Sequence, residues 1–313
     1  MSTKFAFVFP GQGSQAVGML DAWGDHPEVA RTLAEASAAL GEDIGALIKT
    51  GPKEQLDLTT NTQPVMLTAG IACYRAWIAE TGLVPAAAAG HSLGEYTALV
   101  ASGALSLADA LPLVRFRAQA MQEAVRVGAG AMYAVLGLDG DAVRAGCAQA
   151  AAESGEVIEA VNFNDPKQTV IAGSKAGAEK AAEILKAAGA KRTLPLPVSA
   201  PFHSSLMKPA AERLKERLAT TNFGAQAFPV INNIDVAVTD SADAMRDALY
   251  RQAFGPVRWV EVVQALKARG ITHIIECGPG KVLAGMVKRI DGTLVTGTIH
   301  DPASLAEVRG LLA

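Results

Sequence analysis

The chain has 313 residues, of which 50% are hydrophobic and 19% are charged, and its formal net charge is −3. This composition excludes a disordered chain and predicts a large buried core, arranged as two domains or as one large domain with an insertion. The weakly negative charge and the lack of a dense run of Lys and Arg exclude a general affinity for nucleic acid.

Three cysteines, Cys73, Cys147 and Cys277, stand far apart in apolar stretches and form no C-x-x-C motif. We expect them to be small buried residues that form neither a disulfide framework nor a metal site. The apolar run after Lys4 is too short for a signal peptide. Residues 86–105 are interrupted by charged and small polar residues, which excludes a membrane span. We therefore expect a cytoplasmic protein.

Strands and helices alternate in the first part of the chain, which is typical of a parallel α/β sheet covered on both faces. In order we predict a strand at 4–9, a glycine-rich loop at 11–18, helices at 28–40 and 63–80, a strand at 85–90 and a helix at 107–126. Pro64 can occupy the first turn of its helix, and Gly82 can end that helix. Ser106 and Asp109 form an S-x-x-D start for the next helix.

The pattern then changes to β-α-β-β-α-β, the order of a ferredoxin-like domain. Its predicted elements are a strand at 131–138, a helix at 140–153, strands at 156–162 and 168–172, a helix at 175–188 and a strand at 191–196. The first pattern resumes with a helix at 206–219, a strand at 228–232, helices at 241–254 and 258–269, a strand at 272–276 and a terminal α/β unit.

The fold class is therefore α/β, with a large α/β-hydrolase-like domain that contains a parallel sheet and an inserted smaller ferredoxin-like domain. We predict that the large domain comprises residues 1–127 and 198–313, and that the small domain comprises residues 128–197. An insertion of this kind leaves a cleft between the two domains, where substrate sites often lie.

The most informative motif is Gly90-His91-Ser92-Leu93-Gly94, which matches G-x-S-x-G between a predicted strand and a predicted helix. In a nucleophile elbow of this kind, a sharp turn exposes the serine oxygen at a helix N-terminus, where free N–H groups favour negative charge. The motif favours acyl transfer through Ser92. The alternative is a turn of small residues that only packs a strand against a helix.

A tetrahedral intermediate needs two hydrogen-bond donors aimed at its oxygen. One is the backbone N–H of Leu93, and the loop at residues 9–15 is placed to supply the other. Residues 11–16 also match G-x-G-x-x-A, a dinucleotide fingerprint. That alternative requires a second strand ending in an acid near residues 30–36, and this segment has the pattern of a helix, so nucleotide binding is disfavoured.

A serine nucleophile also needs a base, and five histidines are candidates. His203 follows the predicted small domain in the loop Ser199-Ala200-Pro201-Phe202-His203, which borders the cleft and is placed to reach the elbow. The others have the pattern of surface, structural or packing residues: His26, His91, His273 and His300.

Arg115 and Arg117 lie in a mostly apolar predicted helix and, being two residues apart, point to different faces. An inward arginine needs a partner, and a substrate carboxylate would serve. The alternative is that both are solvated or paired with a nearby acid.

Together these motifs resemble those of the malonyl-CoA:acyl carrier protein transacylases, over nearly the full length of the chain. The matching segments are Phe9 to Gln15, Gly90 to Glu95, Arg115-Phe116-Arg117, Ser199 to His203, Gln252 to Trp259 and Glu276 to Gly280. The loop at residues 162–168 departs from the family, because Ser and Gly are usual where Asp165 and Lys167 stand.

The resemblance implies the roles of six residues. Ser92 would be acylated, His203 would be its general base and later the acid, Arg117 would hold the malonyl carboxylate, the N–H groups of Gln12 and Leu93 would form the oxyanion hole, and the main-chain carbonyl of Gln252 would orient His203. A Phe at position 202 goes with malonyl rather than methylmalonyl in related domains.

The resemblance also implies a ping-pong reaction without a bound cofactor. Malonyl-CoA would donate the acyl group, and the phosphopantetheine thiol of holo acyl carrier protein would accept it, which supplies fatty acid synthesis. Such an enzyme is expected to be a monomer. The acidic carrier would need a basic patch, for which the candidates are Lys186, Lys191, Arg192, Lys208, Arg213 and Lys288.

Three other functions remain as alternatives: a serine thioesterase or other hydrolase, an acyltransferase of a polyketide pathway, and a carrier-binding protein without activity. A hydrolase normally has an Asp or Glu after the serine to orient the histidine. No acid stands in an evident position of this kind before His203.

Overall fold

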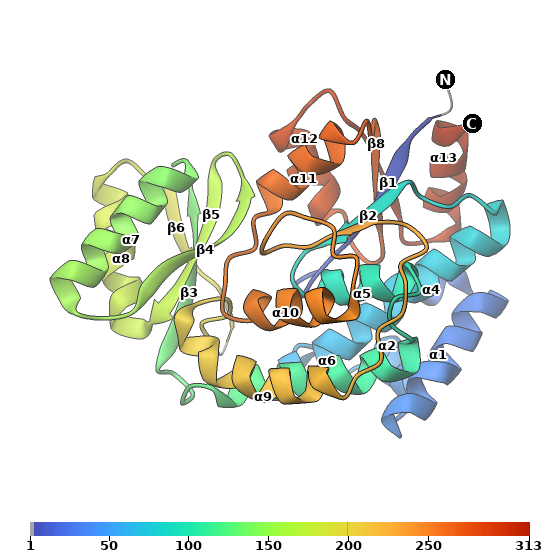
Figure 1. Ribbon diagram of the computed structural model, residues 1–313, viewed down its shortest axis with the longest axis horizontal. Coiled ribbons are helices and arrows are strands. Elements are labelled where there is room, and N and C mark those ends of the chain that lie inside the picture. The colour runs from blue at the N-terminus through green and yellow to red at the C-terminus, as the bar shows by residue number, and fades with distance from the viewer. Residues whose placement is uncertain (1–2, 199) are drawn as a thin grey trace.

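The computed structural model describes residues 3–198 and 200–313, and it contains two separate sheets (Figure 1). The larger sheet has five parallel strands in the order β7-β2-β1-β8-β9. Its strands are β1 (Phe5–Phe9), β2 (Ala87–Gly90), β7 (Val230–Ile231), β8 (His273–Cys277) and β9 (Val295–Ile299). The parallel α/β sheet expected from the sequence is confirmed.

Strand β1 lies in the middle of this sheet, and every one of its side chains is buried. Phe5, Phe7 and Phe9 pack into the core on one face, whereas Ala6 and Val8 pack into the core on the other. Alternate side chains of a strand point to opposite faces, so a continuous apolar strand indicates helices on both sides.

Helices α1, α4, α5, α6 and α9 contribute to the core on the phenylalanine face, and α11 and α12 contribute to the core on the opposite face. The helices around the larger sheet are α1 (Pro27–Leu40), α2 (Ile44–Thr50), α3 (Lys53–Leu56), α4 (Thr59–Thr81), α5 (Leu93–Ala101), α6 (Leu107–Glu123), α9 (Lys208–Ala219), α10 (Ala242–Gln252), α11 (Trp259–Ala268), α12 (Val282–Ile290) and α13 (Pro302–Leu312), with single 3-10 turns at Asp21–Trp23 and Ser205–Met207.

The smaller sheet has four antiparallel strands in the order β4-β5-β3-β6 and stands to one side of the larger sheet in Figure 1. Its elements are β3 (Gly130–Leu136), α7 (Gly140–Ser154), β4 (Ile158–Asp165), β5 (Gln168–Ser174), α8 (Lys175–Ala187) and β6 (Arg192–Pro195). This is the predicted β-α-β-β-α-β order. The division of the chain at residues 128 and 197 stays a prediction.

Strand β4 contacts elements that pack on the larger sheet. The backbone N–H of Phe163 donates to the carbonyl of Val257 over 3.0 Å, and the N–H of Val257 donates to the carbonyl of Val161 over 2.8 Å. Arg289 of α12 also pairs with Asp165 at the end of β4 over 2.6 Å. These contacts hold the small sheet against the segment that precedes α11 and against α12.

The start of α4 was predicted wrongly. The helix begins at Thr59, so Pro64 lies inside it rather than in its first turn. Leu58 precedes the helix and no side chain caps it, so the sequence lacked the usual start signal. The predicted end of α4 at Gly82 is confirmed, because Gly82 has a left-handed φ of 67°. The predicted start of α6 after Ser106 is also confirmed, because Ser106 Oγ accepts from the N–H of Asp109 over 3.0 Å.

The predictions also omitted α2 and α3. The start of α2 carried a signal, because Asp43 Oδ1 caps the N–H of Ala46 over 2.8 Å. The three cysteines are buried and unpaired, as predicted. Among the helices of the described residues, none has the length and apolar character needed to cross a membrane.

Candidate active site

Ser92 occupies a strained turn between β2 and α5, with φ of 52° and ψ of −107°. The glycines of the motif are required by close packing. A Cβ atom on Gly90 would lie 1.9 Å from the carbonyl of Gly94, and one on Gly94 would lie 2.0 Å from the carbonyl oxygen of Phe9. The first turn of α5 can therefore cross directly over the ends of β1 and β2, which presents Ser92 at the sheet edge.

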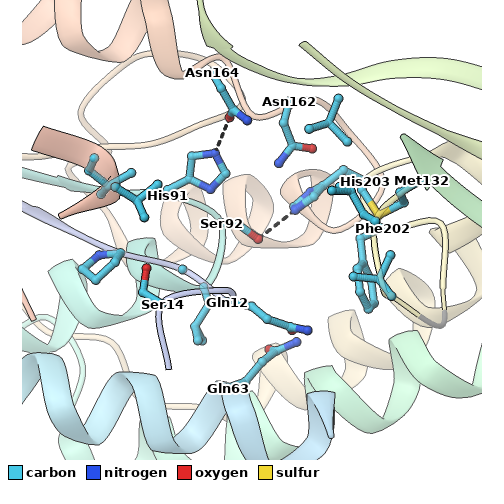
Figure 2. A pocket seen from close by; sticks show the side chains of 18 of the residues that line it. Gln12, Ser14, Gln63, His91, Ser92, Met132, Asn162, Asn164, Phe202 and His203 are labelled. Carbon is cyan, nitrogen blue, oxygen red and sulfur yellow. Dashed lines mark hydrogen bonds between the residues drawn. The ribbon is translucent and has the colours of Figure 1, made fainter. Parts of the chain in front are cut away.

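His203 contacts this serine directly (Figure 2): its Nε2 atom lies 2.7 Å from Ser92 Oγ. Its Nδ1 atom lies 2.9 Å from the main-chain oxygen of Gln252. Because a carbonyl only accepts, Nδ1 carries the proton and Nε2 is left to accept one from the serine. Burial, and then the charge of Arg117, lower the pKa of His203 to about 3, so the imidazole is neutral at pH 7.

Arg117 of α6 is 2% exposed and reaches the same serine. Its Nη2 atom donates to Ser92 Oγ and to Gln252 Oε1, both over 3.1 Å, and Nη1 donates to Gln63 Oε1 over 2.8 Å. In the part of the chain that the structure describes, its Nε has no hydrogen-bond partner, and no carboxylate lies within ion-pair distance of the guanidinium. A buried cation whose hydrogen-bond acceptors are all neutral is suited to pair with an anion.

Arg115, two residues earlier, points to the surface instead. Its Nη1 and Nη2 atoms donate to the two carboxylate oxygens of Glu42 over 2.6 and 3.1 Å. Of the two arginines, Arg117 is the one that faces the serine.

Gln12 and Leu93 both line the cavity that contains Ser92. Leu93 is the first residue of α5, and Gln12 lies in the loop after β1, where its side chain donates to Thr59 Oγ1 over 3.2 Å. The six predicted site residues therefore come together: Gln12, Ser92, Leu93, Arg117, His203 and Gln252. Ser199, part of the predicted histidine loop, lies outside the described residues.

The cavity has a volume of about 210 Å³ and lies between the two sheets. The small sheet supplies Met132, Asn162 and Val170 to its wall, and α12 supplies Leu283 and Met286. Most of this lining is apolar, with the polar groups gathered around Ser92, as is usual for a site that binds an organic substrate.

His91, interpreted as a packing residue, lies in the wall of this cavity. Its Nε2 atom is 2.8 Å from Asn164 Oδ1 (Figure 2). The ring of His91 also lies 5.6 Å from that of Trp259. It thus links the elbow to β4 of the small sheet. Asp165 and Lys167 face away: Asp165 pairs with Arg289, and Lys167 Nζ lies 3.8 Å from Asp139. These departures from the family do not line the cavity.

Sequence reasoning missed Asn233, which follows β7 and is completely buried. Its Oδ1 atom accepts from the N–H of Ser92 over 2.8 Å, and its Nδ2 donates to the carbonyl of Gly90 over 2.7 Å. β7 pairs with β2, and the carboxyl ends of parallel strands meet at one sheet edge. A polar residue at the end of β7 was the signal that could have identified it.

Gln63 of α4 and Glu95 of α5 were also missed, although both are buried polar residues next to the site. Among the described residues there is no group of three or more His, Cys, Asp or Glu side chains that could hold a metal ion.

Known proteins with similar sequences are acyl transferases. The profile of the acyl transferase domain matches residues 6–295. The malonyl CoA-acyl carrier protein transacylase of Escherichia coli (strain K12) is 52% identical over 305 residues, which are 97% of this chain and 98% of that protein. The relative of the same name from Bacillus subtilis (strain 168) is 45% identical over 305 residues, which are 97% of this chain and 95% of that protein.

Solved structures give the same result. The acyl-carrier-protein S-malonyltransferase from Burkholderia pseudomallei 1710b is 66% identical and has a TM-score of 0.96, with 98% of this chain and 99% of that chain covered. A malonyl-transacylase in complex with its type II PKS acyl carrier protein is 48% identical and has a TM-score of 0.95, with 97% and 98% covered. The chain belongs to the acyl transferase domain family and, within it, to the malonyl CoA-acyl carrier protein transacylases.

Proposed function

We propose that the protein transfers the malonyl group of malonyl-CoA to the phosphopantetheine thiol of holo acyl carrier protein, through a malonyl ester of Ser92. The observation that carries this proposal is the double contact at Ser92 Oγ, which lies 2.7 Å from a neutral histidine and 3.1 Å from a buried arginine without a carboxylate partner. The names of the relatives support both substrates, malonyl-CoA and acyl carrier protein. In this proposal the enzyme is a monomer in the cytoplasm, and its product enters fatty acid synthesis.

In the first half-reaction, His203 Nε2 accepts the proton of Ser92, and Ser92 Oγ attacks the thioester carbonyl. The negative charge that develops on the carbonyl oxygen is stabilised by the backbone N–H groups of Gln12 and Leu93. The C–S bond then breaks, and His203 returns the proton to the sulfur of CoA. Throughout this step the main-chain oxygen of Gln252 accepts from Nδ1 of His203.

In the second half-reaction the pantetheine thiol of the carrier gives its proton to His203, and the thiolate attacks the malonyl ester. The C–O bond to Ser92 breaks, and Oγ recovers its proton from His203. The partner of Nδ1 is a neutral carbonyl rather than a carboxylate, so it stabilises the imidazolium less. A thioester is an activated acyl donor, which makes this weaker support sufficient.

Arg117 selects the acyl group. The malonyl carboxylate pairs with its guanidinium, and an acetyl group leaves the buried cation unpaired, which disfavours acetyl more strongly than a difference in size would. Phe202, which lines the cavity next to His203, restricts the room beside the α-carbon and favours malonyl over methylmalonyl.

The experiment mixes the purified protein with malonyl-CoA, methylmalonyl-CoA or acetyl-CoA and measures release of CoA with and without holo acyl carrier protein. Fast release from malonyl-CoA only when the carrier is present, together with a malonyl adduct on Ser92 that is lost in Ser92→Ala, is the expected result. Equal release with and without the carrier would indicate a hydrolase, and an absent adduct would indicate a protein without this activity.

A further inference from the structure

We propose that Glu95 is the positioning residue on which the nucleophile, the base and Arg117 jointly depend, through its hydrogen bonds to Gln252 and Asn233. The inference rests on the proposed function and deepens it, because it names the side chain that holds Ser92, His203 and Arg117 in their relative positions. Glu95 is a positioning residue rather than a catalytic one, since it does not line the cavity around Ser92.

A single oxygen of Glu95 receives two hydrogen bonds. Oε2 accepts from Nε2 of Gln252 over 2.9 Å and from the backbone N–H of Asn233 over 2.8 Å. The side chain lies in the first turn of α5 and is 2% exposed, so water does not replace these bonds. The two partners are 157 and 138 residues away along the chain, and both continue to the active site.

Through Gln252, this oxygen supports the base and the arginine. Gln252 Nε2 also donates to the main-chain oxygen of Ser92 over 3.0 Å, and its Oε1 accepts from Nη2 of Arg117 over 3.1 Å. The main-chain oxygen of the same residue accepts from His203. If the amide turned over, its NH₂ group would face the guanidinium and its oxygen would face Glu95. The acceptor at Glu95 therefore fixes which way the amide points.

Through Asn233, the same oxygen supports the nucleophile. The backbone N–H of Asn233 is held by Glu95, while its side chain accepts from the N–H of Ser92 and donates to the carbonyl of Gly90. These bonds surround the strained turn at Ser92. A shift of Glu95 Oε2 would consequently move both the strained turn and the side chain that holds Arg117.

The two hydrogen bonds to Glu95 depend on the position of its Oε2 atom rather than on the charge of the carboxylate. Burial raises the pKa of Glu95 to about 7, so both the ionised and the protonated carboxyl are present near neutral pH. The protonated acid keeps a carbonyl oxygen that accepts the same two bonds, and so does a glutamine. A shorter aspartate keeps the charge but withdraws the oxygen by one methylene.

The test compares Glu95→Gln with Glu95→Asp. We expect E95Q to keep kcat for malonyl transfer within about fivefold of wild type, and E95D to lose about 100-fold, since displacements of about 1 Å cost this much. We also expect E95D, but not E95Q, to lose preference for malonyl-CoA over acetyl-CoA in self-acylation, because Arg117 is no longer held in place. Mass spectrometry after brief mixing measures the preference, and thermal melts report the stability of each variant.

Thr97→Val is the matched control, because Thr97 lies in the same helix, is 1% exposed, and its hydroxyl has no partner among the described residues. T97V should keep wild-type rate and preference. An E95D rate equal to or above that of E95Q, or an unchanged malonyl preference in E95D, overturns the inference alone. Wild-type protein that takes up no malonyl group overturns the proposed function and this inference with it.

Discussion

The Nη2 atom of Arg117 lies 3.1 Å from Oγ of Ser92, so a buried cation and the nucleophile are in direct contact. This short distance matches the proposed acyl group, because one methylene separates the carboxylate of a malonyl group from its thioester carbonyl. An acyl group that has its carbonyl at Ser92 and its carboxylate at Arg117 is therefore a short one. On this geometry the two residues together select both the charge and the length of the acyl group.

Arg117→Ala should lower kcat/KM for self-acylation by malonyl-CoA by about 100-fold or more, since a charge-assisted pair in a buried site is removed. Acetyl-CoA should become a better donor relative to malonyl-CoA, because the unpaired guanidinium no longer penalises it. Arg115→Ala is the control, as its side chain pairs with Glu42 away from the cavity. Unchanged selectivity in R117A would remove the carboxylate role from this residue.

The rate of self-acylation should show no acid limb near pH 6.5, the ordinary pKa of histidine. Burial lowers the pKa of His203 to about 3, so the base stays neutral over the range in which a solvated histidine would be protonated. Rapid quenching and mass spectrometry between pH 5 and 8 measure this rate. An acid limb with a pKa near 6.5 that persists in Glu95→Gln would contradict the prediction.

The same shift links pH to stability. The folded pKa of His203 lies below its unfolded value, so unfolding takes up a proton between the two, and the free energy of unfolding falls as the pH is lowered from 6.5 towards 3. The slope from this residue is about 1.4 kcal/mol per pH unit within that window. Urea titrations at several pH values between 3 and 6.5 should show that the free energy of unfolding depends on pH more steeply in wild type than in His203→Ala, by about this slope, since the other titrating groups are common to both.

Ser92→Gly should be more stable than Ser92→Ala by about 1 kcal/mol. Both variants remove Oγ and its bonds to His203 and Arg117, so their difference reports the backbone at φ of 52° and ψ of −107°. Strain of this kind costs about 1–3 kcal/mol, and the greater freedom of glycine in the unfolded chain offsets part of it. Chemical denaturation measures the difference, and an S92A variant as stable as S92G would show that the turn stores no strain.

The motifs of the sequence predicted several of the residues that contact Ser92, because each of these lies in a short segment with its own signature, but they did not predict Asn233, which accepts from the N–H of Ser92. Ser92 and Leu93 belong to the elbow, and His203 follows the predicted small domain in a loop at the cleft. The choice between Arg115 and Arg117 came from the resemblance to a family. Burial now distinguishes them, since only one of the two faces the serine.

No short motif contained Glu95 or Asn233, because their roles depend on a contact across 138 residues of the chain, and the position of Asn233 after β7 was the one signal available for it. No local pattern shows that a buried carboxylate in α5 lies beside the end of β7.

Pro64 illustrates a different limit of prediction from sequence. A proline is usual in the first turn of a helix, but α4 begins five residues before Pro64, and no side chain caps its first turn. Tertiary packing, rather than a capping residue, therefore determines where α4 starts. His91 was assigned to packing, since no pattern indicated that β4 of the small sheet would supply Asn164 to it.

The close crossing at the elbow gives the last prediction. Gly90→Ala places a Cβ atom 1.9 Å from the carbonyl of Gly94 and 2.3 Å from the backbone nitrogen of Glu95, and these backbone atoms cannot move aside as a flexible side chain could, so we expect little folded protein. Gly310→Ala is the matched control, because a Cβ atom there meets nothing within 4 Å and the residue lies in helix α13. It should raise the free energy of unfolding by about 0.5–1 kcal/mol, the usual gain from alanine in a helix. Soluble yield and thermal melts of the two variants measure both effects, and a G90A protein as stable as wild type would mean that the elbow is not packed as closely as this geometry requires.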